Sequence, residues 1–188
     1  MRLDGLEWDA PLVEVSPNLW IASDAELILG DVQFLSTAAK LLADRLKKER
    51  FDVIVTAEAK SIALAYALSR ELGQSRFVVA RKNLKAYMGE HISQTVRSIT
   101  TSSEQSLILT SQDAHWIKER KACLFDDVVS TGATLRALED LVHKADGTVA
   151  CCAALWKEGP WYQDERLVYI GSLPVFVNEK NPLWSRAT

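Results

Sequence analysis

The sequence is poor in cysteine and histidine, which limits the metal and redox chemistry that it can support. It has three residues of each type among 188. Cys123, Cys151 and Cys152 lie in apolar runs without a Cys-x-x-Cys pair or a nearby histidine, so we expect reduced core thiols and no zinc site. Neighbouring strand residues point to opposite faces, which argues against a disulfide between the last two. The histidines share no spacing, and we assign them no chemistry.

The sequence also lacks an excess of positive charge and any long apolar run. With 22 basic and 25 acidic residues, the net charge is −3, which excludes the broad basic surface of a protein that binds duplex nucleic acid. No apolar stretch approaches the length of a membrane span, and residues 1–5 lack the apolar core of a signal peptide. We therefore expect a cytoplasmic protein with no nucleic-acid or membrane partner.

What is present is an alternation of strand and helix patterns in a chain long enough for one sizeable core. Hydrophobic residues make up 48% of the sequence, as in an ordinary globular protein, and we expect a single domain over residues 1–188. Because strands alternate with helices, the sequence predicts an α/β fold with a parallel sheet flanked by helices and right-handed crossovers. The expected strands cover residues 51–56, 77–80, 122–125 and 149–156, and the expected helices cover 34–46, 62–72 and 132–145.

Three segments depart from this alternation. Residues 86–111 are rich in Ser, Thr and Gln before the apolar Leu107-Ile108-Leu109, and we expect a long hairpin with a mobile tip. A polar excursion of this length is usually a functional lid or a disordered segment. Residues 12–30 are irregular or strand-like, and the tail has strand-like pieces at 167–170 and 175–177 that are broken by prolines.

The most informative stretch is DDVVSTGAT at residues 126–134, where a buried strand ends in two carboxylates and a small-residue turn opens a helix. Ligands bind at the carboxyl ends of strands in open α/β sheets, and free N–H groups at a helix N-terminus hold a phosphate without a lysine. Gly132 allows a close approach of the backbone to the anion, and Asp126 and Asp127 can accept hydrogen bonds from vicinal ribose hydroxyls. The pattern predicts a ribose 5-phosphate site; the alternative is a capped turn with solvated aspartates. The predicted phosphate-binding residues are Val129, Ser130, Thr131, Gly132, Ala133 and Thr134.

This stretch resembles the signature of the type I phosphoribosyltransferases, which is a hydrophobic strand, two acidic residues, two variable residues, a Thr-Gly pair and a Thr. The resemblance spans about residues 50–157 and implies a Rossmann-like fold, with a small hood lobe built from residues 1–30 and 158–188 and with 86–111 as a flexible lid. It further implies transfer of ribose 5-phosphate from phosphoribosyl pyrophosphate to a purine, with release of pyrophosphate. Asp126 and Asp127 would be catalytic, Mg²⁺ would bind through the substrate rather than through direct protein ligands, and the protein would be a homodimer.

A second loop, formed by Glu58, Ala59, Lys60 and Ser61, follows the first expected strand and resembles the segment that receives pyrophosphate in the adenine and xanthine enzymes. Ser61 stands where glycine is typical. The alternative is a capped helix with a solvated lysine. Arg81 and Lys82 resemble an Arg-Lys pair of the purine members, which with Lys85 would neutralise the leaving pyrophosphate; the alternatives are a surface cluster, or lysines that serve a neighbouring subunit.

The choice of base is left open between adenine and a 6-oxopurine such as xanthine, guanine or hypoxanthine. The lid segment 96–100 is more similar to xanthine than to adenine enzymes. Glu104 either acts as an acid or base on the purine or is a solvated hairpin residue. Lys157 falls where 6-oxopurine enzymes have a lysine that donates to the exocyclic oxygen. A different class, a non-catalytic regulator that senses phosphoribosyl pyrophosphate as purine repressors do, remains the main alternative.

Overall fold

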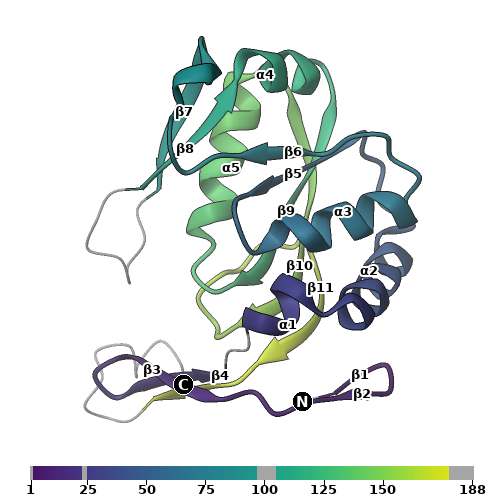
Figure 1. Cartoon of the computed structure of the whole chain (residues 1–188), viewed down its shortest axis with the longest axis vertical. Coiled ribbons are helices and arrows are strands. Elements are labelled where there is room, and N and C mark those ends of the chain that lie inside the picture. The colour runs from purple at the N-terminus through teal and green to yellow at the C-terminus, as the bar shows by residue number, and fades with distance from the viewer. Residues whose placement is uncertain (1, 23–24, 97–104, 178–188) are drawn as a thin grey trace.

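The computed structural model describes residues 2–22, 25–96 and 105–177 (Figure 1). Its centre is a five-stranded sheet in the order β11-β10-β9-β5-β6, in which every neighbouring pair is parallel. The α/β fold with a parallel sheet that the sequence predicted is therefore confirmed. The strands are β5 (Val53–Ala57), β6 (Val78–Ala80), β9 (Lys121–Val129), β10 (Thr148–Glu158) and β11 (Leu167–Leu173).

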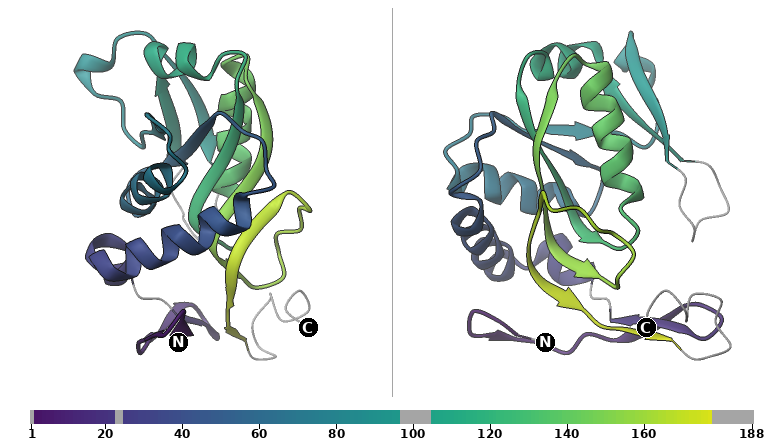
Figure 2. Two further views of the ribbon diagram at one scale, coloured as in Figure 1. Left: turned by 90° about the vertical axis from the view of Figure 1, so that its right-hand side faces the viewer. Right: turned by 180° about the vertical axis from the view of Figure 1, so that it is seen from behind.

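Helices cover both faces of this sheet (Figure 2). On one face α2 (Val32–Leu46) and α3 (Ser61–Glu71) contact each other and the sheet, and on the other face lies α5 (Ala133–Lys144). The start of α2 is fixed by Asp31, whose carboxylate accepts a hydrogen bond of 2.8 Å from the Phe34 amide. This is the preferred N-cap arrangement. The apolar residues of α2 recur at helical spacing and form one buried stripe. They are Phe34, Ala38, Ala39, Leu42, Ala43 and Leu46.

The sheet is buried on both faces, as expected for a parallel sheet between helices. Every residue of β5 is buried. Val53 and Val55 belong to the core beneath α5, while Ile54 belongs to the core beneath α2 and α3. The two cores also separate Cys152 from Cys151, in agreement with the opposite faces predicted for these neighbours, and all three cysteines are free and buried.

The chain reverses its direction of progress across the sheet between β5 and β9. From β5 the chain passes through α3 to β6 on one side, whereas β9, on the other side of β5, leads through α5 to β10 and β11. A crevice opens at such a switch point, beyond the carboxyl ends of the two central strands. The two loops singled out in the sequence both lie there.

The connection from β10 to β11, residues 159–166, contains no helix. Parallel neighbours are usually joined through a helix. Here the chain returns through bends and a turn, and its Tyr162 packs into the core on the α5 face. We call residues 159–166 the strap.

The polar excursion after β6 contains the predicted hairpin. Strand β7 (His91–Val96) pairs antiparallel with β8 (Gln105–Thr110), after a short 3-10 helix η1 (Ala86–Met88). Leu107 and Leu109 are buried in the core. Residues 97–104, including Glu104, lie outside the described residues, so the lid function stays a prediction. The helix α4 (Ser111–Ile117) that follows β8 was not predicted.

A small sheet gathers the two ends of the chain below the main sheet (Figure 1). It consists of β12 (Val175–Val177), β4 (Leu19–Ala22) and β3 (Leu12–Ser16), and a short hairpin of β1 (Arg2–Leu3) and β2 (Leu6–Glu7) precedes it. The predicted hood included residues 158–188, but residues 167–173 form β11, an edge strand of the main sheet. The hood assignment of the remaining ends stays a prediction.

One short element differs from the sequence expectation. Residues 25–30 form a helix, α1 (Ala25–Gly30), where an irregular or strand-like segment was expected. Ile28 is buried there and Leu27 packs against the same core, but six residues give less than two turns of periodicity to detect. Within the described ranges, no helix is long and apolar enough to cross a membrane.

Candidate functional site

Ser61 joins the two loops at the crevice. Its hydroxyl lies 3.0 Å from Asp126 Oδ1 and 3.1 Å from Asp127 Oδ1, and the Asp127 amide donates to it at 3.1 Å. A hydroxyl has one proton to donate, so it can satisfy only one carboxylate at a time. Ser61 begins α3 and is 2% exposed. Ser61 therefore ties the start of α3 to the aspartate pair.

Lys60 supplies the positive charge next to this pair. Its Nζ is 3.0 Å from Asp127 Oδ2, with 48% of the Lys60 side chain exposed and 7% of that of Asp127. A half-exposed ammonium on a flexible stem can leave the carboxylate when an anion arrives. The structure thus brings together the predicted residues Lys60, Ser61, Asp126 and Asp127.

The environment of Asp126 favours its neutral form. Burial is the main cause that raises the pKa of Asp126, and the neighbouring Asp127 carboxylate raises it further. The hydrogen bonds from Ser61 and from the Asp127 amide act in the opposite direction and are outweighed. Two carboxylates that share a buried site cannot both ionise without cost. Asp126 can therefore donate as well as accept a hydrogen bond, which suits an array of vicinal hydroxyls.

The loop from Ser130 to Thr134 leads from β9 into α5. Gly132 occupies the N-cap position with φ of 74° and provides no side-chain cap, so α5 begins at Ala133 without a side chain on its first amides. Such amides carry the positive end of the helix dipole. The Thr131 carbonyl is held at 2.7 Å by Nη2 of Arg136. The Val129 side chain is 1% exposed and packs in the core, so only its backbone can serve a ligand.

Gly132 has a second role that the sequence did not reveal. A Cβ atom built at this position would lie 2.0 Å from Cδ2 and 2.3 Å from Cε2 of Tyr162. No side chain fits in that space, and a positive φ also disfavours any residue but glycine. Glycine is therefore required by the ring behind the loop, in addition to the close approach of an anion in front of it.

Glu58 and Arg81 form a second charged group beside the first. The Glu58 carboxylate is paired with Arg81 Nε, and the Glu58 amide donates to the Ala80 carbonyl at 3.0 Å. Burial acts to raise the pKa of Glu58, but the Lys82 amide, Arg81 and the charge of Lys85 together lower it. The peptide bond between Glu58 and Ala59 is cis. This group contains the predicted residues Glu58, Arg81, Lys82 and Lys85.

Arg81 also connects the crevice to the hairpin. Its amide donates to the Ile108 carbonyl at 2.8 Å, and the Ile108 amide donates back at 2.9 Å. This isolated antiparallel bridge fastens β8 to the end of β6. Lys82 and Lys85 are exposed, so their side chains are available to a ligand.

The sequence reasoning missed Glu158, the last residue of β10. It is 7% exposed, and burial raises the pKa of its carboxyl, although the Ser130 hydroxyl and the charge of Lys60 act to lower it. A buried acid thus contacts the loop from Ser130 to Thr134. Its place directly after the predicted Lys157 was the one available signal, since neighbouring strand residues face opposite ways.

Lys157 itself points elsewhere. Its backbone pairs with Val129, but its Nζ lies 5.9 Å from the centre of the Tyr169 ring on β11. It borders an open hollow together with Gln163, Asp164, Glu165, Leu167 and Tyr169. The structure does not bring the Lys157 ammonium to the aspartate pair, and its role toward a base stays a prediction.

A small hollow with aromatic walls lies between the small sheet and the crevice. The Trp8 ring is 5.2 Å from that of Phe34 and 6.1 Å from that of Trp156. Lys60 and Val128 line the same hollow, so apolar rings and the aspartate group share a border.

Comparisons with known proteins agree with this geometry. The family profile described as the Phosphoribosyl transferase domain matches residues 28–181. An adenine phosphoribosyltransferase of Thermosipho africanus is 32% identical over 135 residues, 72% of this chain and 76% of that protein. A xanthine phosphoribosyltransferase of Clostridioides difficile is 26% identical over 130 residues, 69% and 67% of the two chains. The purine biosynthesis transcriptional repressor PurR of Bacillus subtilis is 30% identical over 142 residues, 75% of this chain and 48% of PurR.

The fold is also shared with solved structures. The APRTase of Giardia lamblia, crystallised with 9-deazaadenine, superposes with a TM-score of 0.70 at 17% identity, covering 87% of this chain and 93% of that one. At this identity the likeness establishes the fold. Together with the family profile and the matched transferases, it shows that the chain belongs to the phosphoribosyltransferase family, in its purine branch.

Proposed function

We propose that the protein transfers ribose 5-phosphate from phosphoribosyl pyrophosphate to a ring nitrogen of a purine and releases pyrophosphate. The observation that carries this proposal is the group formed by Lys60, Ser61, Asp126 and Asp127 next to the N-terminus of α5. Paired carboxylates that face hydroxyls, an adjacent cation and a helix N-terminus are the partners that a ribose 5-phosphate requires. The family match supports the same reaction class.

The residues of the crevice divide the work of such a transfer. The sugar passes through an oxocarbenium-like state, so rate acceleration depends on positioning the reactants and on stabilising the departing anion. Asp126 and Asp127 would hold the ribose hydroxyls. The loop from Ser130 to Thr134 would bind the 5-phosphate, and Lys60 and Arg81 would exchange their carboxylate partners for pyrophosphate oxygens.

Mg²⁺ fits this proposal as an ion carried largely by the substrate. Across the described ranges, no three or more His, Cys, Asp or Glu side chains gather into a metal-binding group. Asp126 and Asp127 would face the ribose hydroxyls and would hold the ion through those hydroxyls and water. When bound, Mg²⁺ would neutralise charge on the pyrophosphate.

We place the base at the border of the aromatic hollow, beside Lys60 and Val128. Which purine binds is open. The matched relatives include both an adenine and a xanthine enzyme. The contact of Lys157 with Tyr169 removes part of the support for a 6-oxopurine. The lid sequence, which is more similar to that of xanthine enzymes, still favours one.

The experiment that tests the function is a pyrophosphate-release assay with phosphoribosyl pyrophosphate, Mg²⁺ and each of adenine, hypoxanthine, guanine and xanthine. We expect release with at least one base. No release with any base, together with saturable binding of phosphoribosyl pyrophosphate, would favour the alternative of a non-catalytic sensor. The similarity to the repressor PurR gives that alternative its specific support.

We also propose that the protein acts as a homodimer in the cytoplasm, with residues 86–111 as a lid that excludes water during transfer. Sedimentation at several protein concentrations tests the dimer. A single monomeric species throughout would contradict it.

A further inference from the structure

We propose that Tyr162 is a positioning residue for the phosphate: the strap clamps its ring against Gly132 and so fixes the backbone of the loop from Ser130 to Thr134. This inference rests on the proposed function, since it concerns the loop that would bind the 5-phosphate. It adds a residue from a segment that the motif does not contain.

The ring contact comes first. Tyr162 is 5% exposed, and its Cδ2 and Cε2 fill the space that a Cβ atom of Gly132 would occupy. Protein interiors are close-packed and resist compression. The loop backbone at Gly132 therefore cannot retreat toward the core, and the ring sets the position of the first amides of α5.

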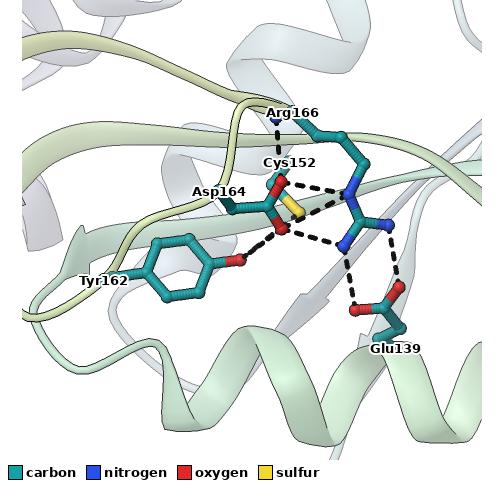
Figure 3. Close-up of polar contacts among 5 residues, drawn as sticks. All are labelled: Glu139, Cys152, Tyr162, Asp164 and Arg166. Carbon is teal, nitrogen blue, oxygen red and sulfur yellow. Dashed lines mark hydrogen bonds and ion pairs between the residues drawn. The ribbon is translucent and has the colours of Figure 1, made fainter.

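The ring is fixed at its far end by a hydroxyl that donates to Asp164 Oδ2 at 3.1 Å (Figure 3). Burial, followed by the neighbouring Cys152 and Asp164, raises the pKa of Tyr162, so the hydroxyl keeps its proton to donate. Asp164 in turn accepts from the Arg166 amide at 2.9 Å and from Arg166 Nη2 at 2.8 Å. The hydrogen bonds from Arg166 are the main reason that the pKa of Asp164 is lowered to about 2.

Arg166 attaches this arrangement to α5. Its Nη1 and Nη2 donate to the two carboxylate oxygens of Glu139 at 2.8 and 3.2 Å. This is a bidentate pair, the strongest geometry for these groups. The two side chains are 39% and 23% exposed, so solvent partly screens the ion pair. The pair therefore orients the strap on α5 more than it stabilises the fold.

A second contact from the same helix closes the arrangement. Arg136 lies one turn before Glu139 on α5, and its guanidinium carbon is 6.0 Å from the centre of the Tyr162 ring. The same Arg136 holds the Thr131 carbonyl at 2.7 Å. The loop, the ring, the strap and the helix are thereby joined in one closed set of contacts that leads from Thr131 back to Gly132.

The burial of Tyr162 excludes another role for it. An aromatic residue near a purine site is a candidate for stacking on the base. The ring of Tyr162 is covered by Gly132 and belongs to the core under α5. Its effect on a ligand must therefore pass through the loop, which preorganises the amides before the phosphate arrives.

The test compares the wild-type protein with two variants, Tyr162→Leu and Tyr162→Phe. Each protein is titrated with two ligands. Titration calorimetry with ribose 5-phosphate reports on the loop after β9, and titration with pyrophosphate and Mg²⁺ reports on the loop after β5. We expect Tyr162→Leu to lower the affinity for ribose 5-phosphate by about tenfold and to leave the affinity for pyrophosphate unchanged. Tyr162→Phe keeps the ring and loses one hydrogen bond, so it should rescue most of the affinity.

A general loss of structure would lower the affinity for both ligands together. A loss for ribose 5-phosphate alone therefore indicates positioning of the loop. If Tyr162→Leu does not fold, Glu139→Gln serves in its place, because it loosens the strap from the surface of α5. This variant should lower the affinity for ribose 5-phosphate by about threefold. Equal affinity for ribose 5-phosphate in the wild type, Tyr162→Leu and Glu139→Gln would overturn the inference and leave the proposed function intact. No binding of ribose 5-phosphate by the wild type would overturn the proposed function, and the inference with it.

Discussion

The two loops at the crevice are held in place by different kinds of interaction. The loop from Ser130 to Thr134 rests on packing, because Gly132 lies against the buried ring of Tyr162. The loop from Glu58 to Ser61 rests on charge and hydrogen bonds, through Arg81 and the aspartate pair. Packing does not change when an anion binds, whereas ion pairs must be exchanged for it. The first loop is therefore built before the substrate arrives, and the second is built to rearrange.

The largest effect that we expect is from Gly132→Ala, which attacks the packed loop. It combines a positive φ with the overlap on Tyr162 and should lower the free energy of unfolding by about 3 kcal/mol. Binding of ribose 5-phosphate should be lost. Urea unfolding and calorimetry measure the two effects.

The chain offers a matched control in Gly73→Ala. Gly73 also has a positive φ, 69°, but no atom lies within 4 Å of the position of its Cβ. It should cost about 1 kcal/mol from the backbone alone. Equal losses for the two variants would mean that the ring contributes nothing to the loop.

Next in size is the effect of Asp127→Asn, at the point where the two loops meet. The change removes the charge that Lys60 faces at 3.0 Å and replaces one of the two acceptor oxygens with a donor. We expect the turnover to fall about 100-fold, measured as pyrophosphate release. An unchanged rate would show that the sugar binds elsewhere.

A smaller effect is expected from Asp126→Asn, which should stabilise the fold, whereas Gly132→Ala should destabilise it. Because the pKa of Asp126 is raised in the folded protein, this group favours folding most below its unfolded pKa, about 4, and that contribution is lost as pH rises toward the folded value. The variant should therefore be more stable than the wild type by about 1 kcal/mol near pH 8, with the difference vanishing near pH 4.

Chemical denaturation from pH 4 to pH 8 checks this slope. The same variant should bind ribose 5-phosphate less well than the wild type. A parallel pH dependence for both proteins would show that Asp126 ionises normally.

The smallest effect should come from Glu58→Gln, which frees Arg81 for pyrophosphate. We expect the dissociation constant for pyrophosphate to fall about threefold, since the competing carboxylate is gone. Asp113→Asn is the control, because it breaks a comparable pair with Arg76 at 2.6 Å without touching the crevice. Weaker binding by Glu58→Gln would show that the pair positions Arg81 instead of competing for it.

The sequence predicted the parts of the fold that depend on local pattern. The strand, the two aspartates and the turn into α5 are contiguous, so the switch-point site followed from residues 126–134 alone. The helix α2 followed from its apolar stripe. By contrast, α1 and α4 are too short for periodicity to distinguish them from loops.

The contacts that the sequence could not reveal lie between distant parts of the chain. Ser61 reaches Asp127 across 66 positions, and Tyr162 meets Gly132 from a different crossover. Lys157 and Glu158 differ by one place on β10, where a register irregularity occurs after Val149. A shift of one residue exchanges the two faces of a strand, so the pattern alone could not decide which of the two would face the crevice.

The helix-free strap sets a limit on how this chain can vary in length. Because β11 starts level with Cys152 while β10 continues to Glu158, the returning segment must cover roughly 20 Å at the rise of an extended chain. Extra residues could bulge into solvent at little cost, but a deletion would pull the tyrosine away from the glycine beneath it. Among homologous sequences, gaps in this connection should therefore be far rarer than insertions.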